Sequence, residues 1–198
     1  GESPVEYARR SAQVLERYLA EHHNEIAALI VEPLVQGATG MAMYDAEYLK
    51  LARAACGRHS VHLIADEIMI GCGRSGTFFA HEQAGITPDF LCLSKGITGG
   101  YLPLSVVLTT DPVYAAFYAD DVTRGFLHSH SYTGNPLACR AALATLDIFD
   151  EDDVIVQNHG RAQQLGEALA KVAQHPAVRN VRRRGMICAF DVTPAQAD

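Results

Sequence analysis

The stretch LCLSKGITGGYLPLSVVLTT, from Leu91 to Thr110, decides the fold, because a glycine-rich turn joins two apolar runs. The first run ends at a lysine, Lys95, and the second begins near Ser105. An ammonium group beside a buried strand is costly unless it has a partner or gives up its charge. The position of Lys95 therefore needs a chemical explanation as well as a structural one.

Short apolar runs alternate with segments of helical periodicity along the rest of the chain. The run at 26–31 has the length and composition of a strand that is buried on both faces of a sheet. Apolar residues at spacings of three and four between Val5 and Leu19 instead indicate a helix. We expect helices at 5–23, 45–58, 135–149 and 154–173, and strands at 26–31, 61–65, 90–93, 105–109 and 186–192. This alternation predicts an α/β domain with a mostly parallel sheet flanked by helices.

Polar residues follow the predicted strands at the point where each strand ends. Glu32 follows the first strand, Asp66 and Glu67 follow the second, and Lys95 follows the third. In open parallel sheets, ligands bind outside the carboxyl ends of the strands. We therefore expect Asp66 and Lys95 to lie on one ligand-binding rim.

The bulk composition excludes several classes of partner. The formal net charge of −7 argues against nucleic acid or an anionic membrane, and the run Arg182–Arg184 is most simply a solvated turn before the last strand. We expect no signal peptide, and no apolar run reaches the length of about 18 residues that a membrane span needs. Five scattered cysteines without a C-x-x-C pair are typical of buried free thiols in a reducing compartment. We therefore expect a cytoplasmic protein.

A lysine that lies on a ligand-binding rim and is largely shielded from water has a specific chemical use. Desolvation favours the neutral amine, which is a nucleophile and forms a Schiff base with an aldehyde. Pyridoxal phosphate is such an aldehyde, and its pyridine nitrogen needs a carboxylate partner. Lys95 and Asp66 are candidates for these two roles. The alternative is a surface salt bridge between Asp66 and Lys95 without any catalysis.

The loop Gly71–Gly76 fits a competing motif, the dinucleotide fingerprint G-x-G-x-x-G. Its context is poor, because the residues from Asp66 to Ile70 separate the loop from the preceding strand. The two carboxylates at the start of that segment would repel a pyrophosphate, and no clear helix begins at Gly76. The fingerprint alone is therefore a weak indication of a nicotinamide-nucleotide oxidoreductase.

The segment from His128 to Thr133 is a polar loop before a predicted helix. The His128-x-His130 spacing could place two rings on one face for a metal, but no third ligand is obvious nearby. Hydroxyl and amide groups in the same loop could instead hold a phosphate. An ordinary capping loop is the equally simple alternative.

Three strings of the sequence together resemble one known family. LIADEIMIGCGRSG, LCLSKGITGGYLPLS and HSHSYTGNPLAC are similar to motifs of the class III, or omega, pyridoxal-phosphate-dependent aminotransferases of fold type I. The motifs follow the family's order and spacing, and the resemblance covers essentially the whole chain. It implies a homodimeric aminotransferase with a large cofactor-binding domain, here residues 1–150, and the start of a small C-terminal α/β domain, here 151–198.

The resemblance also implies roles for particular residues. Lys95 corresponds to the lysine that forms the internal aldimine with pyridoxal 5'-phosphate and then moves the proton. Asp66 corresponds to the partner of the pyridinium nitrogen, and Ile68 to a residue that packs on the ring. His130 and Ser131 correspond to a pair that reaches the cofactor phosphate of the neighbouring subunit.

Two further positions, Ser129 and Arg74, correspond to substrate contacts at the edge of the active site.

Departures from the family pattern narrow the choice of substrate. Met69 stands where ornithine, acetylornithine and 4-aminobutyrate enzymes carry glutamine, and Ala38 stands where they carry a glutamate that gates specificity. These departures resemble the subgroup that moves an amino group from S-adenosylmethionine to 8-amino-7-oxononanoate in biotin biosynthesis. Lysine remains open as the amino donor.

Family members are roughly twice as long as this chain. We expect the chain to be their central piece, without the N-terminal phosphate loop and without a C-terminal substrate-binding arginine, and to be inactive or nearly so alone. Two alternatives stay open: another omega-amino acid or diamine transaminase, and a non-catalytic fragment that pairs with a partner chain.

Overall fold

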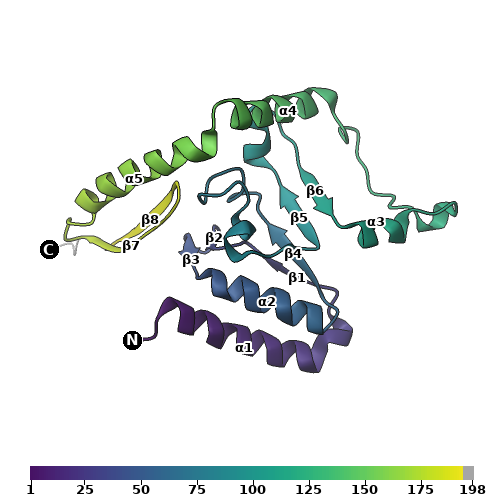
Figure 1. The fold of residues 1–198 in the computed structure, drawn as a ribbon, viewed down its shortest axis with the longest axis horizontal. Helices are drawn as coiled ribbons and strands as arrows, with labels where there is room; N and C mark the ends of the chain where they lie inside the picture. Colours follow the sequence, from purple (N-terminus) through teal and green to yellow (C-terminus); the bar gives the residue numbers. More distant parts are fainter. Residues whose placement is uncertain (194–198) are drawn as a thin grey trace.

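The computed structural model describes residues 1–193 and centres on a four-stranded sheet of order β1-β4-β5-β6 (Figure 1). The first three strands are parallel, and β6 is antiparallel to β5. The prediction of a mostly parallel sheet flanked by helices is therefore confirmed. The elements are α1 (Pro4–His22), η1 (His23–Glu25), β1 (Ala28–Val31), β2 (Val35–Gln36), β3 (Ala42–Met43), α2 (Ala46–Arg58), β4 (His62–Asp66), η2 (Ala80–Ala84), β5 (Phe90–Leu93), η3 (Lys95–Thr98), β6 (Val106–Thr109), α3 (Asp111–Phe117), η4 (Val122–Arg124), α4 (Pro136–Glu151), α5 (Val154–Val172), β7 (Val178–Arg184) and β8 (Ile187–Val192).

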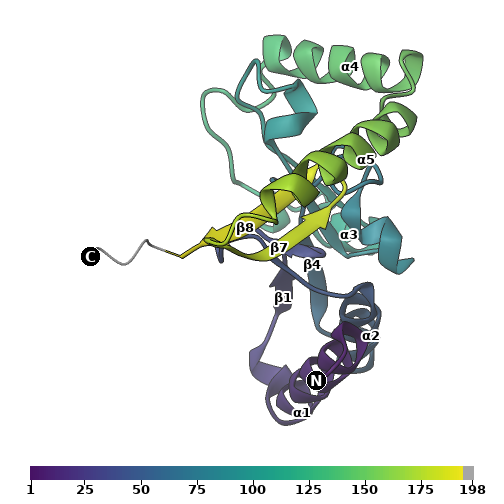
Figure 2. The same cartoon turned by 90° about the vertical axis from the view of Figure 1, so that its left-hand side faces the viewer.

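The two N-terminal helices begin where the sequence supplies capping groups. The Ser3 hydroxyl accepts from the Glu6 backbone N–H while the Glu6 carboxylate accepts from the Ser3 N–H, which is a capping box, and Pro4 occupies the first turn. The Asp45 carboxylate accepts from the Glu47 N–H at the start of α2. Figures 1 and 2 show α1 and α2 side by side in both views. These helices carry the apolar cover of the sheet.

One face of the sheet, here called the closed face, is covered by these helices and by the segment that contains η2. Because side chains alternate along a strand, Leu63 and Ala65 of β4 share this face with Leu91 and Leu93 of β5. Leu63 is completely buried in a cluster with residues of α1 and α2, and the other three pack around Phe79. The closed face is the main hydrophobic core of the sheet.

The opposite face, here called the open face, carries the alternate residues of the same strands. Ile30 of β1 is 60% exposed and Val107 of β6 is 61% exposed, although both occur in apolar strands. Their cross-strand partners on this face, Ile64 and Cys92, are only partly buried. Burial on both faces was predicted for the first strand, and within the described residues that prediction is wrong for its open face, where Ile30 lies.

A second, two-stranded sheet of β7 and β8 lies beside α5 (Figure 1). The expectation of a solvated turn at Arg182–Arg184 is wrong, because these residues form the end of β7. Arg182 donates to the main-chain oxygens of Gly40 and Met41, and Arg184 donates to the Gln83 side chain at 3.0 Å. The three arginines tie this hairpin to the rest of the molecule instead of projecting freely into solvent.

The ends of the other predicted elements agree with the structure to within two residues. The hairpin β2–β3, the short helix α3 and strand β7 had no clear sequence signal. The predicted boundary near Glu151 coincides with the end of α4 but stays a prediction, and the end of the second predicted domain, 194–198, lies outside the described residues.

No helix within residues 1–193 is long and apolar enough to cross a membrane. All five cysteines are free, but only Cys56 is buried.

Candidate active site

Asp66 and Lys95 both lie at the carboxyl ends of parallel strands, on the same rim of the sheet. Asp66 is the last residue of β4 and pairs in register with Cys92 of β5. The ladder continues one step further, because the Glu67 N–H donates to the Cys92 carbonyl at 3.0 Å. Lys95 follows three residues after Cys92 and begins η3. The parallel pairing of β4 and β5 therefore brings the two candidate residues to one edge.

The Asp66 side chain projects from the open face and is half-buried. Its Oδ1 atom accepts a hydrogen bond from the Ile68 N–H at 3.1 Å, which holds the carboxylate against the turn that follows β4. No hydrogen bond within residues 1–193 reaches the other oxygen, Oδ2. No ion pair in this described part joins Asp66 to Lys95, so the simple salt-bridge alternative has no support. One carboxylate oxygen is thus available to a ligand.

Lys95 occupies an unusual backbone conformation, with a φ of 47°. The turn around it is firmly anchored: Ile97 and Thr98 are buried, and the Thr98 hydroxyl donates to the Leu102 carbonyl at 2.6 Å. The Lys95 side chain itself is exposed. The expectation of a mostly dry lysine is therefore wrong for this chain by itself, because no described segment covers the rim where the side chain emerges.

The loop Gly71–Gly76 packs directly against the lysine turn. A Cβ on Gly71 would lie 2.8 Å from the Glu67 carbonyl oxygen, and one on Gly96 would lie 2.9 Å from Cβ of Cys72. A Cβ on Gly73 would lie 2.7 Å from a side-chain carbon of Ile155 in α5. Contacts this close leave no room for a side chain. The glycine spacing therefore has a packing reason that does not involve a dinucleotide.

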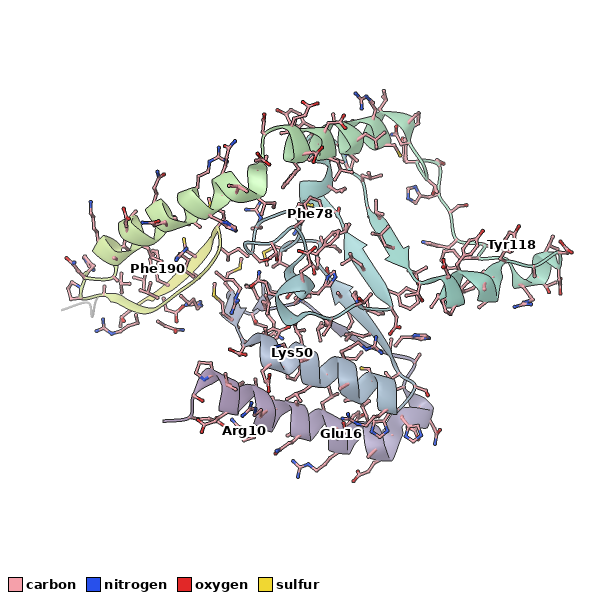
Figure 3. All side chains as sticks on the ribbon, viewed as in Figure 1. Arg10, Glu16, Lys50, Phe78, Tyr118 and Phe190 are labelled. Atoms are coloured by element: carbon pink, nitrogen blue, oxygen red, sulfur yellow. The ribbon has the colours of Figure 1, made fainter. Side chains whose placement is uncertain are left out.

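Side chains of this loop extend the same packing. Phe78, labelled in Figure 3, contacts Phe149 of α4 edge to face with ring centroids 5.2 Å apart. Burial raises the pKa of the Cys72 thiol, and the nearby Glu67 carboxylate raises it further. Arg74 lies exposed at the tip of the loop, where its carbonyl accepts from the Met186 N–H at 2.9 Å. Arg74 is therefore accessible to solvent, and its role at the edge of the active site stays a prediction.

Glu67 is a buried charged residue that sequence reasoning placed only at the end of a strand. Its side chain has no exposed surface, and its carboxylate accepts three N–H groups from Ala80 and His81. The only sequence signal was the Asp66-Glu67 pair itself, because nothing in the pattern connects Glu67 with a histidine fourteen residues later. The structure thus adds a buried Glu67–His81 pair directly beneath the rim.

The segment that contains Ser129, His130 and Ser131 belongs to a different part of the surface. All three residues are exposed, on the connection that Figure 1 shows between α3 and α4. The loop is held by its own bonds: the His130 N–H donates to the Thr133 hydroxyl at 3.0 Å, and the Tyr132 N–H donates to His130 Nδ1 at 3.1 Å. No hydrogen bond in the described chain joins it to Asp66 or Lys95. No group of three or more metal-binding side chains gathers in residues 1–193.

The rim residues fit the reactive end of pyridoxal phosphate. Asp66 offers a carboxylate oxygen, Oδ2, that accepts no hydrogen bond within the described residues, and Lys95 offers an exposed amine. Ile68, which lies between them in the sequence, has a half-buried apolar side chain. A protonated ring nitrogen, an aldehyde and an apolar ring need these three kinds of partner.

Comparison with known proteins defines the class. The family description Aminotransferase class-III matches residues 3–198. The chain therefore belongs to the class III aminotransferases, which are pyridoxal-phosphate enzymes.

Particular relatives narrow the resemblance further. The chain is 49% identical over 187 residues to the adenosylmethionine-8-amino-7-oxononanoate aminotransferase of Helicobacter pylori. This match covers 92% of this chain and 43% of that protein. It superposes on the crystal structure of the enzyme of the same name from Methanocaldococcus jannaschii with a TM-score of 0.86 at 35% identity, over 91% of this chain and 42% of that one. It also superposes on the omega transaminase from Pseudomonas jessenii in complex with PMP, with a TM-score of 0.88 at 31% identity, over 100% and 45% of the two chains. The chain spans less than half the length of each of these proteins.

Proposed function

We propose that this chain is part of an aminotransferase that moves an amino group from S-adenosylmethionine to 8-amino-7-oxononanoate and so forms 7,8-diaminononanoate for biotin biosynthesis. The observation that carries the proposal is that one rim holds both the exposed Lys95 amine and an Asp66 oxygen, Oδ2, that accepts no hydrogen bond within the described residues. The names of the most similar curated relatives support the substrates. The cytoplasm is the proposed location.

Three residues of the chain would do the chemistry at the rim. Pyridoxal phosphate, when bound, supplies an electron sink that lets an amino group pass between two substrates. Asp66 Oδ2 would accept a hydrogen bond from the ring nitrogen and keep that nitrogen protonated, while Ile68 packs on the ring. The Lys95 amine would hold the cofactor covalently between turnovers and would carry a proton to and from the substrate carbon that bears the nitrogen.

The loop of Ser129, His130 and Ser131 supports the proposal of a homodimer. These residues have no bond to their own rim, so we propose that His130 and Ser131 bind the cofactor phosphate in the site of a second copy. Ser129 and Arg74 would then contact substrate from the two sides of the shared site. A polar loop with exposed hydroxyl, imidazole and N–H groups has the chemistry that a phosphate needs.

Met69 packs against the turn that carries Ala38, which supports the choice of substrate. Cε of Met69 lies 2.9 Å from the position that a Cβ on Gly37 would take, and Gly37 directly precedes Ala38. The Gly37 N–H donates to the Glu32 carboxylate at 2.8 Å, which fixes this turn beside Met69. An apolar wall of this kind would suit the hydrocarbon chain of 8-amino-7-oxononanoate better than a second carboxylate.

Covalent labelling of the lysines tests the cofactor assignment. The chain has three lysines, Lys50, Lys95 and Lys171, so peptide mapping after borohydride reduction can separate them unambiguously. We expect pyridoxal phosphate on Lys95 of the full-length protein, together with a visible absorbance band that the Lys95→Ala variant lacks. Lys50→Ala is the matched control, since this lysine is exposed on α2, away from the rim (Figure 3). Labelling of Lys50 and Lys171 in preference to Lys95 would overturn the assignment.

Turnover with a panel of amino donors tests the substrates. S-Adenosylmethionine, lysine and simple omega-amines would be offered with 8-amino-7-oxononanoate as acceptor. Activity with omega-amines and other oxo acids alone would favour the alternative of a general omega transaminase, the name borne by the Pseudomonas jessenii relative. The 198-residue chain by itself should show little or no turnover, and substantial activity from it would contradict the proposed need for the rest of the protein.

A further inference from the structure

The buried Glu67–His81 pair at the end of β4 is a charged network that the proposed chemistry does not use. Glu67 Oε2 accepts from the Ala80 N–H at 2.6 Å, and Oε1 accepts from the His81 N–H at 2.9 Å and from His81 Nδ1 at 2.8 Å. Because a carboxylate can only accept, Nδ1 of His81 must carry a proton. A buried carboxylate is tolerated only when such donors replace its water. The site is therefore built to hold this charge in one orientation.

The main chain of Glu67 is held as firmly as its side chain. Its N–H donates to the Cys92 carbonyl at 3.0 Å, and its carbonyl accepts from the Gly71 N–H at 2.9 Å. Residue 67 therefore links the end of β5, the glycine loop and η2 through five hydrogen bonds, two from its main chain and three to its carboxylate. No other residue at this rim is fixed from so many directions in the described structure.

Asp66 and Glu67 are consecutive, so their side chains point to opposite sides of the strand. Asp66 projects from the open face, and Glu67 is buried on the other side against His81. A rotation of the main chain that released Glu67 would also swing the Asp66 carboxylate away from the Ile68 N–H that now holds Oδ1. The anchor on the inner side thus determines where the outer carboxylate points.

We propose that the Glu67–His81 pair is a positioning device that fixes the Asp66 carboxylate for the ring nitrogen of the cofactor. The proposal rests on the proposed function, because only a bound pyridoxal phosphate makes the exact direction of Asp66 Oδ2 matter. Glu67 and His81 touch neither the cofactor nor the substrate in this arrangement. They act through Asp66.

Four variants separate positioning from simple stability. Glu67→Gln keeps the size of the side chain, but its NH₂ group must face a donor N–H. His81→Leu removes the ring donor, whereas His81→Asn places an amide N–H near the position of Nδ1 and should restore the bond. Phe79→Leu is the matched control, because it removes the ring that stacks on His81 at 5.5 Å and leaves every bond to Glu67 in place.

Two measurements are made on each variant. The first is the dissociation constant of pyridoxal phosphate and the position of its visible band in the full-length protein. The second is the amide hydrogen exchange of Ile68 in the 198-residue chain without cofactor, which reports directly on its bond to Asp66. We expect Glu67→Gln and His81→Leu to weaken cofactor binding by about tenfold or more, equal to the loss of one hydrogen bond to a charged group, and to speed Ile68 exchange.

The controls should behave differently. His81→Asn should stay within about threefold of wild type, and Phe79→Leu should lower the unfolding temperature while cofactor affinity and Ile68 exchange stay near wild type. Wild-type affinity and Ile68 exchange in folded Glu67→Gln would overturn the proposal. If Glu67→Gln does not fold, equal results for His81→Leu and His81→Asn would overturn it instead. Failure of the wild-type protein to bind pyridoxal phosphate would refute the proposed function, and Ile68 exchange would still decide whether the pair positions Asp66.

Discussion

The two faces of the central sheet are made by the same strands and differ in what covers them. On the closed face, Leu63 and Leu91 are buried under helices and the η2 segment. On the open face, Ile30 and Val107 are mostly exposed although their strands are equally apolar. The apolar pattern of a strand therefore shows that both faces are suited to burial, and the structure shows which face the chain itself can bury.

The proposed chemistry lies on the side that the chain does not bury. Asp66 projects from the open face, and Lys95 emerges at its rim. An apolar surface next to polar, chemically active groups is typical of a contact surface or a ligand site. The described residues thus divide into a closed face that stabilises the fold and an open face that carries the candidate site.

Removal of a core side chain from the closed face should have the largest effect on stability. Leu63 of β4 is completely buried in a cluster with residues of α1 and α2, so Leu63→Ala leaves a cavity. We expect the free energy of unfolding to fall by about 2–5 kcal/mol, measured by urea denaturation. A loss below about 1 kcal/mol would mean that the closed face is not the main core.

Asp66→Asn should separate the two faces most clearly, because it should affect catalysis and leave stability nearly unchanged. Asparagine keeps the Oδ1 atom that accepts from the Ile68 N–H but replaces Oδ2 by an NH₂ group. We expect kcat/KM of the full-length protein to fall by about 10²–10³, and the free energy of unfolding to change by less than about 1 kcal/mol. A fully active Asp66→Asn enzyme would refute the assignment of Asp66.

Asp89, which lies at the amino ends of the strands, should make the free energy of unfolding depend on pH in the acid range. Burial by itself raises the pKa of Asp89, but the Leu63 N–H and the Arg53 guanidinium, both 2.7 Å from Oδ2, lower it more, so the net pKa is lowered. The stabilisation from Asp89 is therefore complete above the unfolded value of about 3.9 and is lost as pH falls through the lower folded value. We expect Asp89→Asn to cost about 1–3 kcal/mol at neutral pH.

Urea denaturation of both proteins from neutral pH to about pH 3 measures this contribution. The stability difference between wild type and Asp89→Asn should shrink as the pH falls below about 4. A difference that stays constant over that range would show that the Asp89 carboxylate gains nothing from its partners in the folded state.

Substitution on the open face should have the smallest effect on the isolated chain. Ile30 is 60% exposed, so Ile30→Thr removes little buried surface and keeps the β-branched shape that suits a strand. We expect the free energy of unfolding to change by less than about 0.5 kcal/mol, with less aggregation in light scattering. A large loss in the 198-residue chain would mean that something in solution, such as a second copy, already covers this face.

The sequence predicted those features that depend on local patterns. The Asp45 cap, the apolar strands and the shared rim of Asp66 and Lys95 follow from capping chemistry, from apolar runs and from the geometry of parallel strands. The exposure of Lys95 could not be predicted, because it depends on which face the chain covers. The role of the arginines in β7 was missed, because their acceptors at Gly40 and Gln83 are distant in sequence.

The left-handed backbone conformation of Lys95 lowers the stability of the fold, while the lysine side chain at the same position serves the proposed reaction. A side chain in that conformation costs roughly 1–2 kcal/mol, which glycine would avoid at some cost in chain entropy. Selection for a stable fold alone would therefore favour glycine at position 95, and under the proposed function the lysine is kept because its amine is needed. Copies of this gene freed from selection for activity should lose Lys95 early, and replacement by glycine should then be tolerated better than replacement by alanine.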